Sequence, residues 1–208
     1  MDSLPVAPST YLGDPAKRAG RYALEQAEGF NILRIPPDLI DGDTPPVVYQ
    51  TAATHCMARR AMLIIDPPNV WQDACARRAI NGITPAALDA FSLDAARNSA
   101  VYFPRVPVPD PLRSGQVRTF PNSGYLAGIW ARADLSTGVW KASAGLSAGL
   151  NDVIALADPL DDATNGALDA QGINCLRNFP IGGIVAWVRV PSVAPMRLTP
   201  MSTFQSAG

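Results

Sequence analysis

Residues 61–66 form a continuous apolar run, Ala-Met-Leu-Ile-Ile, that ends at Asp66 and is followed by Pro67 and Pro68. A strand that is apolar at every position is typical of a sheet covered on both faces, and such sheets are mostly parallel. Proline cannot donate a hydrogen bond within a sheet, so the two prolines mark the end of this strand. The run therefore predicts an α/β fold with a central sheet flanked by helices.

Segments on either side of this run alternate between strand and helix signals. Further strands are expected at 30–35, 99–103, 172–177 and 182–187, the last two joined by a turn at 180–183. Helices are expected at 14–28, 47–60, 70–81, 85–96, from Ser123 to a stop at Gly138, and 160–170. Strands separated by helices imply right-handed crossovers, so we expect a mainly parallel sheet. Prolines at 104, 107, 109 and 111 predict a stiff, extended connection outside the centre of that sheet.

Composition limits the classes of protein that the chain can belong to. Its 208 residues, of which 48% are apolar, can bury one substantial core. A net charge of -1 leaves no basic footprint for nucleic acid, and Arg59-Arg60 and Arg77-Arg78 are interpreted as solvated helix ends. Residues 1–10 lack the features of a secretory signal, and no window is apolar enough to span a bilayer. We therefore expect neither nucleic acid nor a membrane as a partner.

The three cysteines are an odd number and are widely spaced. Cys56, Cys75 and Cys175 contain no Cys-x-x-Cys pair, so neither a disulfide framework nor a zinc site is indicated. We expect them to be buried thiols in a reducing cytoplasm.

Catalytic chemistry would require side chains that converge in space. A serine hydrolase needs a nucleophilic serine, a histidine base and a carboxylate, but the single histidine, His55, lies mid-helix beside Cys56, where packing is favoured over proton transfer. Ser123 is interpreted as a helix cap, and Asn122-Ser123-Gly124 lacks the Gly-x-Ser-x-Gly turn of hydrolases. Asp66 ends a strand, where α/β sheets place functional groups. A hydrolase-like or nucleotide-binding enzyme with a site near Asp66 or Ser123 is therefore the alternative to a protein without catalytic residues.

No other cluster indicates a ligand. Metal sites need closely spaced Asp, Glu, His or Cys, and the acidic pair Asp161-Asp162 instead suits the start of a helix. Gly124 and Gly128 lack the Lys-Ser/Thr ending of a phosphate-binding loop, and Gly182-Gly183 precedes a strand rather than a helix. We expect no catalytic, cofactor-binding or metal-binding residues and no cofactor.

Four short motifs follow one another in the second half of the chain. They read Pro-Asn-Ser-Gly-Tyr-Leu-Ala-Gly-Ile-Trp-Ala-Arg-Ala-Asp at 121–134, Gly-Val-Trp-Lys-Ala-Ser-Ala at 138–144, Gly-Ile-Asn-Cys-Leu-Arg at 172–177 and Gly-Gly-Ile-Val-Ala-Trp at 182–187. The first predicts a helix whose apolar side packs closely through Gly128. In the second, Trp140 and Lys141 are expected on an extended, exposed piece that packs or contacts a neighbouring subunit rather than a ligand.

In this order, the motifs resemble those of the contractile tail sheath proteins of bacteriophages and related injection systems. There the segments read Pro-Ser-Gly-x-Val-Ala-Gly-x-x-Ala-Arg-x-Asp, Gly-Val-Trp-Lys-Ala-Pro-Ala, Gly-Ile-Asn-x-Ile-Arg and Gly-x-x-x-Trp-Gly-Ala-Arg-Thr-Leu. The likeness extends, more weakly, from about Arg21 to Trp187. It implies the fold called subtilisin-like in that family, and a structural subunit that polymerises with other subunits around a tail tube. Contraction would drive the tube through a cell envelope, the subunit lying in the virion tail after assembly in the bacterial cytoplasm. A soluble adaptor or baseplate-like binding module would share the fold.

The resemblance also divides the chain. It implies an N-terminal remnant at 1–20, a subtilisin-like sheath domain at 21–187 that runs into the start of the C-terminal domain, and a divergent tail at 188–208. In the family, arms at both ends donate strands to the sheets of neighbours. The chain lacks most of these parts, so we expect that it is a truncated or frameshifted fragment and does not form sheath tubes alone.

The tail begins where the expected Trp-Gly-Ala-Arg-Thr is replaced by Trp187-Val188-Arg189-Val190-Pro191. The codons TGG GGT GCG CGT ACC, after loss of one G, become TGG GTG CGC GTA CC, which begins Trp-Val-Arg-Val-Pro. We hypothesise that residues 188–208 are an out-of-frame translation, the alternative being a divergent tail. The DNA sequence of the gene distinguishes the two.

Overall fold

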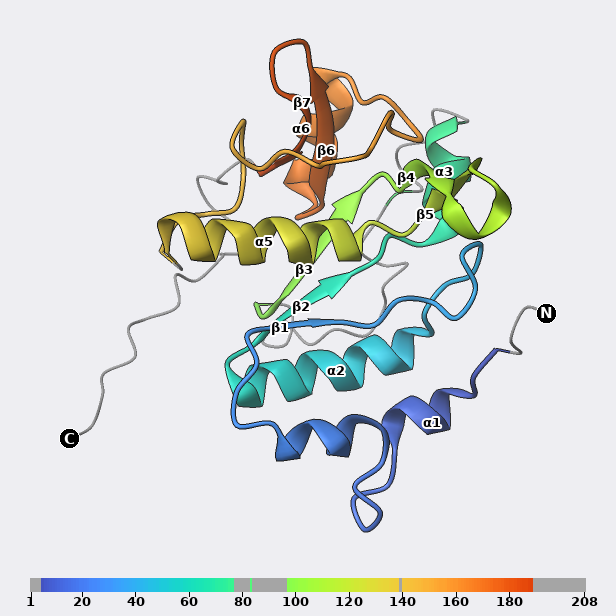
Figure 1. The fold of residues 1–208 in the computed structure, drawn as a ribbon, viewed down its shortest axis with the longest axis vertical. Coiled ribbons are helices and arrows are strands. Elements are labelled where there is room, and N and C mark those ends of the chain that lie inside the picture. Colours follow the sequence, from blue (N-terminus) through green and yellow to red (C-terminus); the bar gives the residue numbers. More distant parts are fainter. Residues whose placement is uncertain (1–4, 77–82, 84–96, 139, 189–208) are drawn as a thin grey trace.

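The computed structural model describes residues 5–76, 83, 97–138 and 140–188 (Figure 1). Its main sheet has five strands in the order β1-β2-β3-β6-β7. They are β1 (Ile32–Arg34), β2 (Met62–Ile65), β3 (Ser99–Phe103), β6 (Asn174–Phe179) and β7 (Gly183–Trp187). The first four in this order are mutually parallel, and β7 is antiparallel to β6. The prediction of an α/β fold with a mainly parallel sheet is confirmed.

Most of the expected helices are present. The α-helices are α1 (Pro8–Leu12), α2 (Pro46–Arg59), α3 (Asn69–Ala76), α5 (Ser123–Thr137) and α6 (Asp162–Ala170), and the 3₁₀ helices are η1 (Gly20–Gln26) and η4 (Pro111–Arg113). The helix expected at 70–81 is confirmed as far as Ala76. Its remainder and the segment 85–96 lie outside the described residues.

The single helix expected at 14–28 is wrong. Over these residues the chain instead forms a turn and then η1, because Arg18 and Gly20 adopt φ values of 48° and 59°, which a helix does not contain. The preceding α1 is followed by Gly13, with φ 73°. The two glycines also lie in close backbone contact, since a Cβ on Gly13 would lie 1.9 Å from the carbonyl oxygen of Ala19. This contact fixes a compact N-terminal segment where the sequence pattern indicated a continuous helix.

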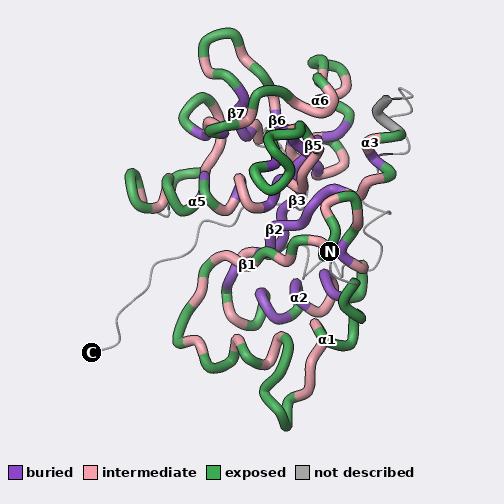
Figure 2. Tube along the Cα trace, turned by 45° about the vertical axis from the view of Figure 1, so that its right-hand side comes forward, coloured by how far each residue is buried: buried purple, intermediate pink, exposed green. Residues whose placement is uncertain are grey.

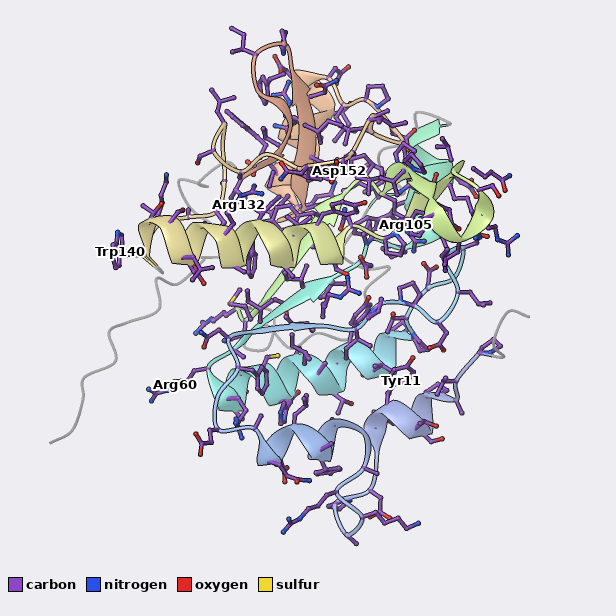
Figure 3. All side chains as sticks on the ribbon, viewed as in Figure 1. Tyr11, Arg60, Arg105, Arg132, Trp140 and Asp152 are labelled. Carbon is purple, nitrogen blue, oxygen red and sulfur yellow. The ribbon has the colours of Figure 1, made fainter. Side chains whose placement is uncertain are left out.

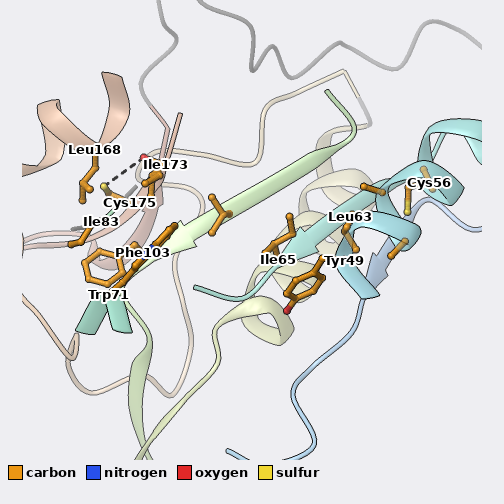
Figure 4. Packing of buried hydrophobic residues seen from close by; sticks show 14 residues of the cluster. Tyr49, Cys56, Leu63, Ile65, Trp71, Ile83, Phe103, Leu168, Ile173 and Cys175 are labelled. Carbon is orange, nitrogen blue, oxygen red and sulfur yellow. Dashed lines mark hydrogen bonds between the residues drawn. The ribbon is translucent and has the colours of Figure 1, made fainter. Parts of the chain in front are cut away.

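Two apolar clusters cover the two faces of the main sheet, as the continuous apolar run predicted. One cluster joins Leu63 and Ile65 of β2 to residues of α2, α3 and α6 (Figure 4). The other joins Ile64 of β2 to Tyr102 of β3 and to the buried side of α5, which includes Leu126, Ile129 and Trp130. Consequently β2 and β3 lie in the buried centre of the molecule (Figure 2).

The proline-rich connection forms a hairpin that sequence reasoning missed. β4 (Val106–Asp110) pairs with β5 (Gln116–Phe120) as a separate antiparallel sheet, with Pro107 opposite Thr119 and Pro109 opposite Val117. The prolines occupy alternate positions, so the residues between them keep N–H groups for the ladder. The prediction that this segment lies outside the centre of the main sheet is confirmed.

The outer edge of β7 is covered by residues 145–150. The N–H of Gly145 donates to Ala186 O at 2.9 Å, Ala186 N–H donates to Ala148 O at 3.0 Å, and Leu150 N–H donates to Ile184 O at 2.8 Å. This segment therefore satisfies backbone groups that an edge strand would otherwise expose. Val188 packs against the α5 side of the sheet, and the rest of the tail hypothesised to be out of frame lies outside the described residues.

Candidate functional site

Asp66 and Ser123 meet at the carboxyl end of β2, where α5 begins. The backbone N–H of Ser123 donates to Asp66 Oδ1 at 2.8 Å, and the Ser123 hydroxyl donates to Oδ2, also at 2.8 Å. Both residues are buried. The structure thus brings together the two residues that the sequence offered separately as positions for an enzymatic site.

The carboxylate of Asp66 caps α5, a role that sequence reasoning gave to Ser123 itself. α5 begins at Ser123, so the N-cap position belongs to Asn122, whose side chain makes no capping hydrogen bond. The interpretation of Ser123 as the cap is therefore wrong. A carboxylate is favourable here because the first N–H groups of a helix carry partial positive charge. Burial raises the pKa of Asp66, while the hydrogen bonds from Ser123 and the charges of Arg105 and Arg34 oppose that rise.

Asn122 fixes the start of α5 against the end of β3. Its amide nitrogen donates to the carbonyl oxygens of Tyr102 and Pro104, both at 2.8 Å. Its Oδ1 is buried and has no hydrogen-bond partner within the described residues. Asn122 and Asp66 together join α5 to the ends of the two central strands.

The Asp66–Ser123 pair has no histidine beside it. The ring of His55 stacks on Phe30 at a centroid distance of 5.8 Å, and within the described residues its buried Nε2 has no hydrogen-bond partner. Burial, followed by the charges of Arg21 and Arg59, lowers the pKa of His55. Because the Ser123 hydroxyl donates directly to a carboxylate, the pair has the geometry of a structural cap and lacks the base of a triad.

Arg105 is a buried arginine that sequence reasoning did not single out. Its guanidinium donates to the carbonyl oxygens of Pro67, Ile40 and Gly42 at 3.0–3.1 Å, and to Asp43 Oδ1 at 2.6 Å. These bonds tie the loop between β1 and α2 to the end of β2. The sequence offered one weak signal, a charged residue two positions after an apolar strand, but a solvated charge is equally common at such a position.

A groove of about 660 Å³ runs along one side of α5. Its lining includes Gly124, Tyr125, Gly128 and Arg132 of α5, together with Asp152. A Cβ added to Gly128 would meet no atom within 4 Å, so the prediction that α5 packs closely through Gly128 is wrong. Burial and then the charge of Asp152 raise the pKa of Tyr125.

Trp140 lies beyond the C-terminal end of α5, where the indole is 76% exposed (Figure 3). Gly138 ends the helix with φ 101°, as predicted, and Lys141 N–H donates to Gly138 O at 3.2 Å. Residues 140 and 141 therefore lie in a turn and not in the extended piece that was expected. The prediction that both side chains are exposed is confirmed.

The remaining candidate residues have structural roles. Asp161 caps α6 by accepting from Thr164 N–H at 2.7 Å, and Asp162 pairs with Arg177 at 2.5 Å, so the predicted helix start is confirmed. Cys56 and Cys175 are buried thiols. The Cys75 side chain lies outside the described part of the structure.

In the described ranges, no three His, Cys, Asp or Glu side chains are grouped as a metal site would require. Among the helices of those ranges, none is both long enough and apolar enough to cross a membrane.

Comparison with protein-family models and with curated proteins gave no match. Comparison with solved structures did. The chain is 28% identical to a chain in the cryo-EM structure of the anti-feeding prophage (AFP) helical sheath in the contracted state, over 69% of this chain and 34% of that one, with a TM-score of 0.50. This chain is related to the contractile tail sheath protein family.

Two further structures share the fold at lower identity. A chain of the PVC sheath complex of an extracellular contractile injection system, in the contracted state, is 23% identical over 79% of this chain, with a TM-score of 0.55. A chain of the AFP baseplate structure is 24% identical over 79% of this chain, also with a TM-score of 0.55. The sheath-related chain spans between 34% and 40% of the length of these three matched chains.

Proposed function

We propose that the chain is a structural subunit, or part of one, of a contractile tail sheath of a phage, prophage or related injection system. The likeness to the AFP helical sheath carries this proposal, because it joins a shared fold to the highest identity among the three structures described. The four sequence motifs support it independently, since they occur in the order typical of sheath proteins. The partners would be other sheath subunits and a tail tube protein.

The proposed role is mechanical and not enzymatic. Ser123 and Asp66 bond directly to each other, and the ring of His55 packs on Phe30, so the alternative of an enzyme near Asp66 or Ser123 has no support. Contraction requires rigid bodies whose mutual contacts rearrange. The links of Asp66, Asn122 and Arg105 between the helix, strands and loop suit such a body.

The finer assignments rest on the same resemblance. We propose that residues 21–187 correspond to the subtilisin-like sheath domain and the start of the next domain, after a remnant at 1–20. The mainly parallel sheet flanked by helices is compatible with that domain. The subunit would assemble in the bacterial cytoplasm and act in the tail.

Immunogold electron microscopy tests this function. The tagged chain is expressed in its source cell, particles are sedimented, and gold directed at the tag is located on them. A sheath subunit predicts gold along the whole length of tubular particles. Gold at one end only would favour the baseplate-like module, and a tag that stays in the soluble fraction would contradict both roles.

A further inference from the structure

Residues 5–26, which we call the N-terminal strap, lie along the outer side of α2 (Figure 1). The strap contains α1 and η1, and neither helix has a buried residue. Elements without buried side chains gain little from the hydrophobic effect and open at low cost. The strap is therefore held by specific contacts more than by burial.

A cavity of about 380 Å³, partly open to solvent, lies between the strap and the layer beneath it. Tyr11 and Leu24 line it from the strap, and Leu33 of β1 with Val48 and Ala52 of α2 line it from below. Protein interiors are normally close-packed, so an open pocket of this size shows that the strap and the layer beneath it are not packed together throughout. The interface between the strap and α2 is incompletely filled.

One carboxylate holds the far end of the strap. Asp38, in the loop after β1, accepts a hydrogen bond from Val6 N–H at 2.8 Å through Oδ2, and one from the Tyr11 hydroxyl through Oδ1. The Asp38 side chain that accepts both hydrogen bonds is exposed to solvent. Removing this single residue would release two attachments at once.

The near end of the strap is attached through Arg59 of α2. Its guanidinium donates to Ala27 O at 2.6 Å and lies over the ring of Phe30 at 5.6 Å. This attachment is partly buried and lies where the chain leaves the strap for β1. The contact between Gly13 and Gly20 is internal to the strap, so it does not depend on docking to α2.

We propose that the N-terminal strap opens as a unit, with the Asp38 contacts as its latch and the Arg59–Ala27 contact as its hinge. Opening uncovers Leu33, Val48 and Ala52, an apolar surface that the closed strap covers. The device does not depend on the proposed sheath function.

Hydrogen–deuterium exchange of the full chain, followed by mass spectrometry, tests the latch. Asp38→Ala should accelerate exchange of the strap amides by about tenfold or more, since two hydrogen bonds to a charged group are lost. Exchange in α2 should stay unchanged. Asp14→Ala is the matched control, because the Asp14 carboxylate accepts from Ala16 N–H and pairs with Lys17, both within the strap.

A cavity-filling variant should act in the opposite direction. Thr51 lines the cavity, and Thr51→Leu adds apolar volume beneath the strap. Each additional methylene that becomes buried should slow exchange of the strap amides by about fourfold. The proposal is overturned if Asp38→Ala leaves strap exchange unchanged, if it accelerates α2 equally, or if Thr51→Leu does not slow the strap.

Discussion

Ser123 donates both its backbone N–H and its hydroxyl to the carboxylate of Asp66, a residue 57 positions earlier in the chain. The pair joins the first turn of α5 to the end of β2 inside the protein. Two residues that resemble parts of a catalytic site thus act as a long-range helix cap.

Removing the acceptor should be costly. Asp66→Ala leaves the Ser123 N–H and hydroxyl buried without their partner, so we expect a loss of about 3 kcal/mol in the free energy of unfolding. Ser123→Ala keeps the backbone bond and should cost about 1 kcal/mol. Urea denaturation measures both values, and equal costs would contradict the capping role of the backbone N–H.

The pH dependence of stability should report the charge on Asp66. Its folded-state pKa is raised by burial, so its contribution is fully present below the unfolded pKa and declines as the pH rises through the folded value. Asp66→Asn can keep both contacts, since the amide can accept from the N–H and donate to the hydroxyl. Relative to Asp66→Asn, the wild type should therefore lose stability as the pH rises above about 4. A constant difference across the pH range would contradict this.

Arg105 should be far more important for stability than an exposed arginine. Arg105→Met removes the guanidinium that donates to three carbonyl oxygens and to Asp43. It should lower the free energy of unfolding by about 3–5 kcal/mol. Arg132→Gln is the control, because Arg132 is exposed and donates to the carbonyl oxygen of Gly149 on the surface, so its loss should cost about 1 kcal/mol or less. Thermal unfolding compares them, and similar costs would refute the role of Arg105 in fixing the loop.

Gly128 should be replaceable and Gly138 should not. Gly128 is helical with open space around its Cα, so Gly128→Ala should stabilise the protein by about 0.5–1 kcal/mol. Gly138 has φ 101°, and an added Cβ would lie 2.2 Å from the Trp140 ring, so Gly138→Ala should destabilise it. Chemical denaturation of the two variants gives both signs, and a loss of stability in Gly128→Ala would show that α5 is packed at that position.

Trp140 should matter for assembly and little for folding. Its side chain is largely exposed, so Trp140→Ala should change the free energy of unfolding by about 0.5 kcal/mol or less. Exposed tryptophans are frequent anchors of protein interfaces, so the same variant should reduce incorporation into sedimentable particles. Normal incorporation of the variant would exclude Trp140 as an anchor.

The fold was largely predictable because its central strands have a local signature. Residues 61–65 and 100–103 are apolar at consecutive positions, as is typical of strands buried on both faces of a sheet. The 14–28 segment was mispredicted because a backbone contact between Gly13 and Gly20 outweighed helix propensity. The β4–β5 hairpin was missed because prolines normally exclude strands, and here they alternate with ladder residues.

The site was less predictable because its contacts are distant in sequence. Asp66 and Ser123 were each named, but their pairing depends on how α5 docks on the sheet. The charge of Arg105 next to an apolar strand did not identify its partners, since Ile40 and Gly42 are 65 and 63 positions away. Backbone carbonyl partners leave no trace in side-chain patterns, so such a network emerges only from the folded chain.

Cryo-EM helical reconstruction of particles purified through a tag on this chain tests the sheath assignment most directly. The account predicts tubular particles in which the five-stranded domain, with α2 and α5 on opposite faces of its sheet, repeats at every helical position around an inner tube. Tubes without density for this domain would contradict it.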